Sequence, residues 1–268
     1  MELYEKNTVV TGAANGIGRA IAQRFHAQGA NIVLADRDIA PLQIVCDELN
    51  AIRANSTHAV VADVSTEAAN AALIAEAESK FGPIDLFFAN AGIGGGTDLS
   101  TSEDDWANAF NINVHSHRWA AKYLLPGWLA RGEGYFCSTA SAAGMLSQIG
   151  SAPYSMTKHA ALAFAEWLSI TYGKRGIRVS CLCPQGVNTN MMRSADAANS
   201  GPSGNVVRTA GVVLEPEQVA EVVTQVINDE TFLILPHPEV AAYAAKKATE
   251  HERWLAGMRK LQQRVLGV

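Results

Sequence analysis

The chain reads Thr-Gly-Ala-Ala-Asn-Gly-Ile-Gly over residues 11–18, directly after a β-branched run at 8–11 and at the start of a helical pattern at 16–28. Its three glycines have the spacing Gly-x-x-x-Gly-x-Gly. Glycine is needed where a strand turns sharply into a helix and where the backbone approaches a phosphate group. The N-terminus of the helix then offers free N–H groups to that phosphate. Glycine also caps ordinary turns, so the position between first strand and first helix is what indicates nucleotide binding.

The rest of the chain alternates short apolar runs with longer helical patterns. The alternation indicates βαβ crossovers and a parallel sheet, and runs without polar alternation, such as 31–35, indicate strands covered on both faces. No linker and no internal repeat divides the 268 residues. We therefore predict one α/β domain over residues 1–268, a doubly wound, Rossmann-like parallel sheet of seven strands with helices on both faces. The predicted strands are 8–11, 31–36, 58–61, 86–90, 134–138, 178–183 and 232–235, and the predicted helices are 16–28, 41–53, 68–81, 104–130, 152–172 and 216–228.

Composition excludes several classes of protein. A chain that is 48% hydrophobic and 18% charged can bury a large core without disulfides or metals. The net charge of -5 gives no reason to expect nucleic acid or an anionic membrane as a partner. We see neither a signal peptide nor an apolar run near the roughly 20 residues that span a bilayer. The cysteines form no CxxC pair and suggest reduced, mostly buried thiols in the cytoplasm rather than a metal site: Cys46, Cys137, Cys181 and Cys183.

Asp36 ends the second predicted strand, 18 residues after Gly18. A carboxylate at this point can accept hydrogen bonds from both hydroxyls of an adenosine ribose, and an aspartate here can equally cap the next helix. Arg37 beside it is the residue that could grip a 2′-phosphate instead. Asn15, within the glycine turn, is neutral. Because Asp36 is acidic and Asn15 is neutral, and only Arg37 could bind a 2′-phosphate, we predict that the site favours NAD over NADP.

Two further strand ends point to the same ligand. The third predicted strand runs into Asp63 and Val64, which can reach an adenine, although an aspartate at a strand end is as often a cap. The fourth ends in Ala-Asn-Ala-Gly over residues 89–92. Small residues are what a cofactor lying across the strand ends requires.

Tyr154 and Lys158 are four residues apart on a strong helical pattern, so they project from one face. A free tyrosine, with a pKa of about 10, is a poor base at neutral pH, and a neighbouring ammonium lowers that pKa. Taken alone, the pair would be a surface contact. Ser141 follows the fifth predicted strand, at the edge where α/β sheets bind ligands, and alone would be an exposed turn residue. Asn113 is polar within an amphipathic pattern and alone would be a helix-surface residue.

In their order and spacing these motifs resemble the short-chain dehydrogenase/reductase family, from residue 8 to about 235. The resemblance implies that Tyr154 is the general acid/base and that Lys158 lowers its pKa and binds the nicotinamide ribose. It implies that Ser141 positions the substrate oxygen and that Asn113 supports a water relay to the lysine. It further implies a cytoplasmic, NAD-dependent oxidoreductase that interconverts a secondary alcohol and a ketone, as a homo-oligomer (dimer or tetramer).

The sequence departs from the family pattern at two positions. Ala89 stands where the family has asparagine, and Gln185 stands where it has glycine after Pro184, which affects the nicotinamide side of the pocket. Thr189 matches the threonine that the family uses near the carboxamide. The cofactor residues expected from the motifs and the resemblance are Gly12, Asn15, Gly16, Ile17, Gly18, Asp36, Arg37, Asp63, Val64, Asn90, Ala91, Gly92, Tyr154, Lys158, Pro184, Gly186, Val187 and Thr189.

Two segments lie outside the motifs. Residues 187–213, rich in Asn, Ser, Gly and Ala, are expected to be a substrate loop that orders over bound cofactor and substrate, or else a surface loop. Residues 238–266 form a predicted helical extension that either packs on its own domain or serves as a subunit contact or pocket cover. The basic residues of this extension are predicted to be solvated: Lys246, Lys247, Arg253, Arg259 and Lys260.

Two other functions compete with hydride transfer. A catalytically silent NAD-binding sensor or scaffold would not need all four of Asn113, Ser141, Tyr154 and Lys158. A sugar-nucleotide epimerase or dehydratase would resemble Gly-x-x-Gly-x-x-Gly at the first turn, which requires glycine at Asn15, and would run longer. His115, His117 and His159 lack convergent partners, so no metal is expected. The pocket candidates are small, apolar or amide-bearing and favour an uncharged secondary alcohol or ketone: Gly94, Gly95, Met145, Gln148, Gln185, Met191 and Met192.

Overall fold

The computed structural model describes residues 1–197, 206–208 and 211–266. The described strands form one seven-stranded parallel sheet in the order β3-β2-β1-β4-β5-β6-β7, so the predicted fold is confirmed. The chain builds the sheet outward from β1 to β3 and then from β4 to β7. The order therefore reverses between β1 and β4, the point where such sheets bind ligands. The strands are β1 (Asn7–Thr11), β2 (Asn31–Asp36), β3 (Thr57–Val61), β4 (Leu86–Ala89), β5 (Gly134–Thr139), β6 (Ile177–Leu182) and β7 (Leu233–Ile234).

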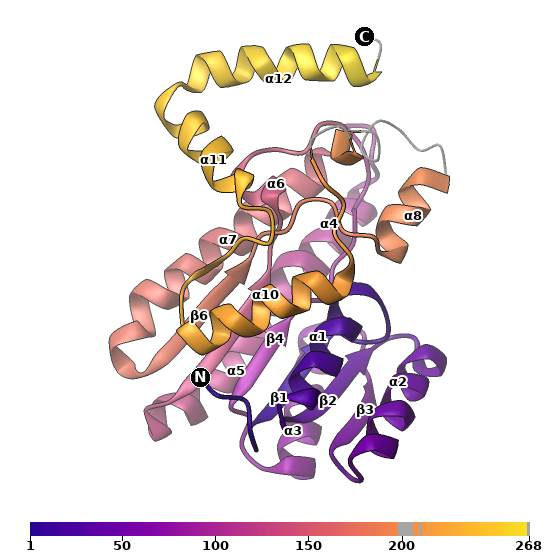
Figure 1. Ribbon diagram of the computed structural model, residues 1–268, viewed down its shortest axis with the longest axis vertical. Coiled ribbons are helices and arrows are strands. Elements are labelled where there is room, and N and C mark those ends of the chain that lie inside the picture. Colours follow the sequence, from indigo (N-terminus) through magenta and orange to yellow (C-terminus); the bar gives the residue numbers. More distant parts are fainter. Residues whose placement is uncertain (198–205, 209–210, 267–268) are drawn as a thin grey trace.

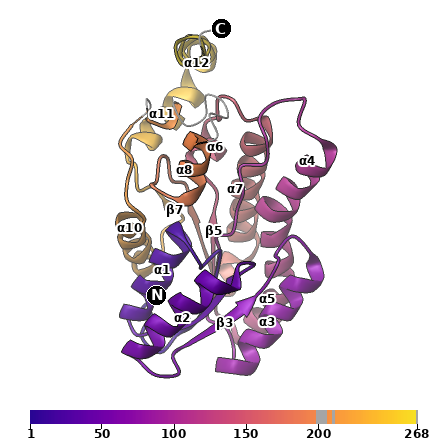
Figure 2. The same ribbon diagram turned by 90° about the vertical axis from the view of Figure 1, so that its right-hand side faces the viewer.

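Helices cover both faces of the sheet (Figures 1 and 2). Buried side chains of α1, α2 and α10 pack on one face, and those of α3, α5 and α7 pack on the other. The described helices are α1 (Gly16–Ala27), α2 (Ile39–Ile52), α3 (Glu67–Phe81), α4 (Glu103–Phe110), α5 (Ser116–Arg131), α6 (Ala142–Met145), α7 (Ala152–Tyr172), α8 (Asn190–Ala197), α10 (Pro216–Asp229), α11 (Glu239–Thr249) and α12 (His251–Leu266).

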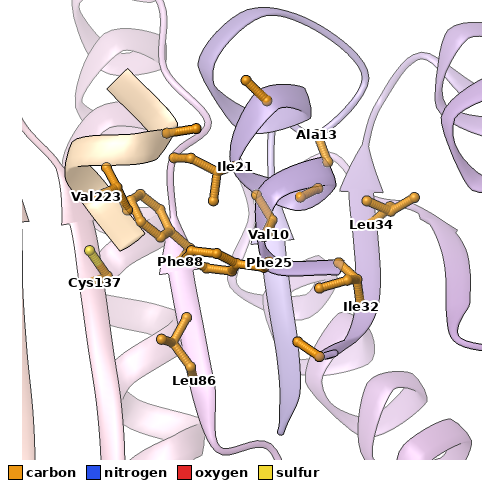
Figure 3. Close-up of a cluster of buried hydrophobic side chains, with 14 of the residues drawn as sticks. Val10, Ala13, Ile21, Phe25, Ile32, Leu34, Leu86, Phe88, Cys137 and Val223 are labelled. Atoms are coloured by element: carbon orange, nitrogen blue, oxygen red, sulfur yellow. The ribbon is translucent and has the colours of Figure 1, made fainter. Parts of the chain in front are cut away.

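The central strands are apolar at successive positions because each faces two helical layers. Val10 and Phe88 point into the cluster under α1 and α10, whereas Val9 and Phe87 point into the cluster on the other face. Successive side chains of a strand point to opposite faces, which is why these runs show no polar alternation. Figure 3 shows the first cluster, where the rings of Phe25 and Phe88 have centroids 6.2 Å apart.

The helix predicted over 104–130 is interrupted. Between α4 and α5 lies a π-helical turn, Asn111–His115, in which the N–H of Ser116 donates to the carbonyl of Asn111. Such a turn accommodates one extra residue, and π-turns occur often at functional sites. Here it carries Asn113, which is buried.

Two other segments differ from their predictions. Residues 187–213 are not a plain loop, because they contain α8 and begin at a parallel bridge from Val187 to Leu214. Residues 198–205 and 209–210 of this segment lie outside the described residues. The C-terminal extension is two helices, α11 and α12, which meet at Glu250.

Candidate active site

A cavity of about 640 Å³ opens at the carboxyl ends of β1, β4, β5 and β6, across the point where the strand order reverses. Most of the residues singled out in the sequence line it. Arg37, Asp63 and Val64 do not, and Asn113 lies behind its wall. The predicted residues that line the cavity are Gly12, Asn15, Gly16, Ile17, Gly18, Asp36, Asn90, Ala91, Gly92, Ser141, Tyr154, Lys158, Pro184, Gly186, Val187 and Thr189.

The glycine turn leaves room that side chains would fill. Gly12 and Gly16 have φ of +66° and +54°, a backbone conformation that favours glycine. A Cβ on Gly16 would lie 3.0 Å from the methyl group of Thr189 across the cavity. Asn15 begins α1 without a side-chain capping bond, so that side chain leaves the first N–H groups of the helix free for a ligand. An open turn in front of an uncapped helix N-terminus fits a pyrophosphate.

Asp36 is fixed against this turn. Its carboxylate accepts hydrogen bonds from the backbone N–H of Ala14 (3.1 Å) and of Asp38 (3.2 Å), and it still lines the cavity. The side chain is therefore both a turn anchor and a group facing the ligand space. Arg37 is exposed, and Asp63 accepts from the N–H of Ser65 (3.0 Å) in a local turn. Of the acidic and basic candidates for the ribose, the structure brings only Asp36 to the cavity.

Asn90 ties together three strand ends. Its side-chain amide donates to the carbonyl of Thr11 (3.0 Å), and its Oδ1 accepts from the hydroxyl of Thr139 (3.0 Å). The hydroxyl of Thr11 in turn accepts from the N–H groups of Asn90 and Ala91, at 2.9 and 3.0 Å. This network joins the ends of β1, β4 and β5. Thr139 was missed in the sequence because a threonine at a strand end carries no signal for such a bond.

Lys158 is a buried ammonium on α7. Its Nζ donates to the carbonyl of Thr139 (3.0 Å) and lies 5.6 Å from the centre of the Tyr154 ring. Burial lowers the pKa of Lys158 to about 8, because a charge is less stable away from water. A Cβ on Gly92 would approach Nζ to 3.2 Å, so glycine at this position leaves the lysine its space.

Tyr154 lies on the first turn of α7, where Ser151 caps the helix by accepting from the N–H of Tyr154 (3.3 Å). Burial raises the pKa of Tyr154, and a hydrogen bond with Ser141 works against that rise. Ser141 also accepts from the N–H of Ala143 (3.1 Å), which holds its hydroxyl at the cavity wall. Hydroxyl, phenol and ammonium therefore converge on one wall.

Asn113 is buried and fully engaged. Its Nδ2 donates to the carbonyl of Ile93 (2.9 Å) and to the hydroxyl of Thr157 (3.0 Å), and its Oδ1 accepts from the N–H of Ile93 (2.9 Å). These bonds hold the segment after β4 against α7, one residue from Lys158. The side chain is not on a helix surface.

Lys247 corrects a prediction. It is only partly exposed, and its Nζ donates to the carbonyls of Met145 (2.9 Å) and Leu146 (2.6 Å) and lies 5.2 Å from the centre of the Trp254 ring. Burial lowers the pKa of Lys247. Nothing in the sequence separates it from Lys246, because its contacts depend on α11 packing over the end of α6.

The remaining polar candidates show no metal site. Among the described residues, no group of three or more His, Cys, Asp or Glu side chains could hold a metal ion. Burial and the charge of Lys158 lower the pKa of His117 to about 3. The four cysteines are free and buried. None of the described helices has the length and apolar character to cross a membrane.

Comparisons with known proteins agree with this geometry. A profile of the short chain dehydrogenase family matches residues 6–200. The meso-2,3-butanediol dehydrogenase of Serratia marcescens is 33% identical over 240 residues, which cover 87% of this chain and 92% of that protein. Oxidoreductase UcpA of Escherichia coli (strain K12) is 34% identical over 260 residues, covering 96% and 92%. The crystal structure of a short chain dehydrogenase/reductase from Burkholderia phymatum in complex with NAD superimposes with a TM-score of 0.85 at 30% identity, covering 94% of this chain and 96% of that one.

Proposed function

Because the chain belongs to the short-chain dehydrogenase family, we propose that it is an NAD-dependent oxidoreductase that interconverts a secondary alcohol and a ketone. The observation that carries the proposal is the convergence of Ser141, Tyr154 and Lys158 on a cavity whose other end is the glycine turn. One relative is named for meso-2,3-butanediol, a compound with secondary hydroxyl groups. A nucleotide-binding turn and a proton-transfer group would therefore act in a single cavity.

The residues fit a dinucleotide. The glycine turn and the start of α1 would hold the pyrophosphate, and Asp36 would accept from the adenosine ribose hydroxyls. Lys158 and Tyr154 would bind the nicotinamide ribose, and Thr189 would meet the carboxamide. NAD, when bound, supplies the hydride acceptor. NAD is favoured over NADP because the carboxylate of Asp36 lines the cavity and the guanidinium of Arg37 does not.

Proton transfer is assigned to Tyr154. In alcohol oxidation its phenolate takes the proton from the substrate hydroxyl as the carbon loses its hydride, and in ketone reduction the phenol returns that proton to the carbonyl oxygen. Ser141 donates to the substrate oxygen and orients it. Lys158, a cation below a pH of about 8, favours the phenolate electrostatically. Asn113 is a positioning residue, because it bonds to Ile93 and to Thr157, the residue before Lys158. The water relay to the lysine stays a prediction.

A variant of the phenol tests the proposal. Tyr154→Phe should bind NAD nearly as well as the natural chain and turn over roughly 100- to 10,000-fold more slowly, since it lacks the acid/base hydroxyl. Tyr172→Phe, which removes a hydroxyl at the far end of α7, is the matched control. Turnover is followed at the nicotinamide absorbance in a screen of secondary alcohols with NAD. More than a tenth of normal turnover in Tyr154→Phe would assign the proton step elsewhere.

The competing function is a catalytically silent NAD-binding sensor or scaffold. It predicts NAD binding by the natural chain with no reduction of cofactor by any alcohol in the screen. The convergence of Ser141 and Tyr154 on the cavity beside Lys158 favours the enzyme, because NAD binding alone needs no proton-transfer group there.

We also propose a location and an assembly. Four free cysteines are in keeping with a reducing, cytoplasmic location. A homo-oligomer would cover the large apolar side chains that α7 exposes in the isolated chain, which are Met156, Trp167 and Ile170.

A further inference from the structure

A second cavity, of about 810 Å³, lies under α12. We call it the α12 groove. Residues 97–99 and 147–152 form one side of the groove, and α12 forms the other. α12 lies at the end of the molecule where α6 and α11 also lie (Figures 1 and 2). Its apolar lining comes from Leu99, Ile149, Trp254, Leu255 and Met258.

The α12 groove adjoins the active-site cavity. The two share three lining residues, Thr97, Gln148 and Ser151. Ser151 caps α7 and stands three residues before Tyr154, which is about 4.5 Å along a helix axis. The groove therefore lies within about one helical turn of the candidate reacting group, Tyr154.

The walls of the groove are fixed. On one side, the N–H of Ala152 donates to the carbonyl of Thr97 (2.9 Å), and the hydroxyl of Ser151 donates to the carbonyl of Gly96 (2.6 Å). These bonds attach the 96–97 segment to the start of α7. The groove wall is thus part of the same rigid element that carries the reacting phenol.

Lys247 fixes the other side. Its ammonium donates to the two carbonyls at the end of α6 and lies over the ring of Trp254. It also lies 3.3 Å from Nε2 of His159, whose Nδ1 lies 2.8 Å from the carbonyl of Ser155. Because that carbonyl can only accept, Nδ1 carries the proton and Nε2 accepts from the lysine. The Lys247 side chain therefore attaches α11 and the start of α12 to α6 and α7.

The lining indicates what the groove accepts. Leu99 is 90% exposed, although a leucine of a folded chain gains by burial. The apolar side of α12 faces a cavity, where an amphipathic helix would ordinarily face a core. The charged residues lining the groove are one acid, Asp98, and one base, Arg259, so neither sign of charge is favoured. An uncharged apolar chain matches these features.

We propose that the α12 groove is a substrate subsite that binds the apolar tail of an elongated secondary alcohol or ketone whose reacting carbon lies at Tyr154. The inference rests on the proposed function and adds the substrate class. Small alcohols would occupy only the active-site cavity.

A homologous series tests the subsite. The ratio of kcat/KM for 2-octanone to that for 2-butanone, measured with NADH, should be on the order of 10- to 250-fold, because a fully buried methylene contributes about fourfold. Met258→Arg, which places a charge in the groove, should reduce the ratio to near one. Gln263→Arg adds the same charge to an exposed site on α12 outside the groove and should keep the natural ratio. Leu99→Asp, on the opposite and exposed wall, is a second variant that should act as Met258→Arg does.

The outcomes separate the subsite from the proposed function. Turnover of both ketones with no preference for the longer one would overturn the subsite and leave the function standing. No turnover of either ketone, with calorimetric binding of 2-octanone that Met258→Arg abolishes, would reject the proposed function and overturn the substrate role of the groove, leaving it an apolar binding site. A smaller mass of Met258→Arg in sedimentation, with an unchanged ketone ratio, would make the groove a contact between copies of the chain and overturn the proposal.

Discussion

Lys158 is held in its place at a cost to stability. Lys158 is 3% exposed, and its ammonium donates to the backbone carbonyl of Thr139. Burial takes its pKa from an ordinary 10.5 to about 8, which corresponds to about 3 kcal/mol. A residue whose only role was structural would not need the charge, since an apolar side chain of similar length would fill the space.

Removal of this charge should change how stability depends on pH. The native state releases the Lys158 proton near pH 8 and the unfolded chain near 10.5, so the unfolded chain binds more protons between these values. The contribution of Lys158 to the free energy of unfolding therefore rises by about 3 kcal/mol across that window. Lys158→Met lacks the group, so any advantage it has over the natural chain below pH 8 should shrink by that amount as pH rises. The free energy of unfolding in urea at pH 7, 8, 9 and 10 measures the difference.

The exposed Lys246 on α11 provides the control. Lys246→Met should keep the pH dependence of the natural chain. Parallel stability curves for Lys158→Met and the natural chain would show that Lys158 keeps its ordinary pKa and that burial is not what sets its chemistry.

At this scale, the order and spacing of the motifs, through their resemblance to the family, predicted side chains that line the cavity, and contacts between distant residues were not predictable. Tyr154 and Lys158 follow from helical periodicity, and both line the cavity. The partner of Lys158 is a backbone carbonyl, which any residue at position 139 would supply. The partners of Asn113 are Ile93 and Thr157, 20 and 44 residues away. A sequence pattern carries no information on bonds of this kind.

The glycine turn and α1 act as one element, because their backbones pack too closely for side chains. A Cβ on Gly18 would lie 2.1 Å from the carbonyl oxygen of Gly12 and 2.6 Å from Nδ2 of Asn90. Asn90 cannot move freely, since it also bonds to Thr11 and Thr139. The third glycine is therefore required by packing between helix, turn and β4.

Gly18→Ala should consequently disrupt the turn. We expect a loss of stability of about 1–3 kcal/mol from overpacking and a large loss of NAD affinity, both followed by thermal unfolding with and without NAD. The matched control is Gly127→Ala inside α5, where a Cβ would meet nothing within 4 Å. That variant should gain up to about 1 kcal/mol from helix propensity. Equal behaviour of the two variants would mean that the close approach at Gly18 has no consequence.

Element boundaries were predicted where a local signal existed. The strands and α7 follow from apolar runs and from periodicity. The π-helical turn at Asn111–His115 does not, because the apolar pattern of 104–130 continues through it. The division of the C-terminal extension at Glu250 had no glycine or proline to mark it. α8 formed in a segment whose Asn, Ser and Gly content indicated a loop.

In the whole molecule, two apolar layers cover the faces of the sheet, and the candidate active site lies at the edge where the strands have their carboxyl ends. The apolar runs predicted the layers, and the order of motifs placed the cavity at the strand ends between β1 and β4. The position of the C-terminal helices was not predictable. It depends on Lys247 reaching Met145 and Leu146, 102 and 101 residues away in the sequence. Long-range docking of this kind requires the three-dimensional structure.

Because the cavity spans both halves of the sheet, cofactor binding should stabilise the entire fold. A ligand that binds only the native state at 100 times its Kd adds about 2.7 kcal/mol, which for a domain of this size raises Tm by about 5–10 °C. We expect this shift with NAD and little of it with NADP at the same concentration. The 2′-phosphate would lie against the carboxylate of Asp36, and one like-charge pair at about 4 Å costs about 4 kcal/mol before screening.

Asp36→Asn tests which residue sets that preference. The variant removes the charge and keeps a side-chain oxygen that can accept from the N–H of Ala14, which Asp36 holds at 3.1 Å. Because the free variant can itself differ in stability, the quantity to compare is the shift in Tm that each cofactor causes, not Tm alone. The two shifts should converge in Asp36→Asn, since NADP no longer meets a like charge and NAD loses an acceptor for its ribose. Equal shifts in the natural chain would contradict the assignment of NAD. A preference for NAD that survives the substitution would transfer the choice from Asp36 to another residue of the cavity.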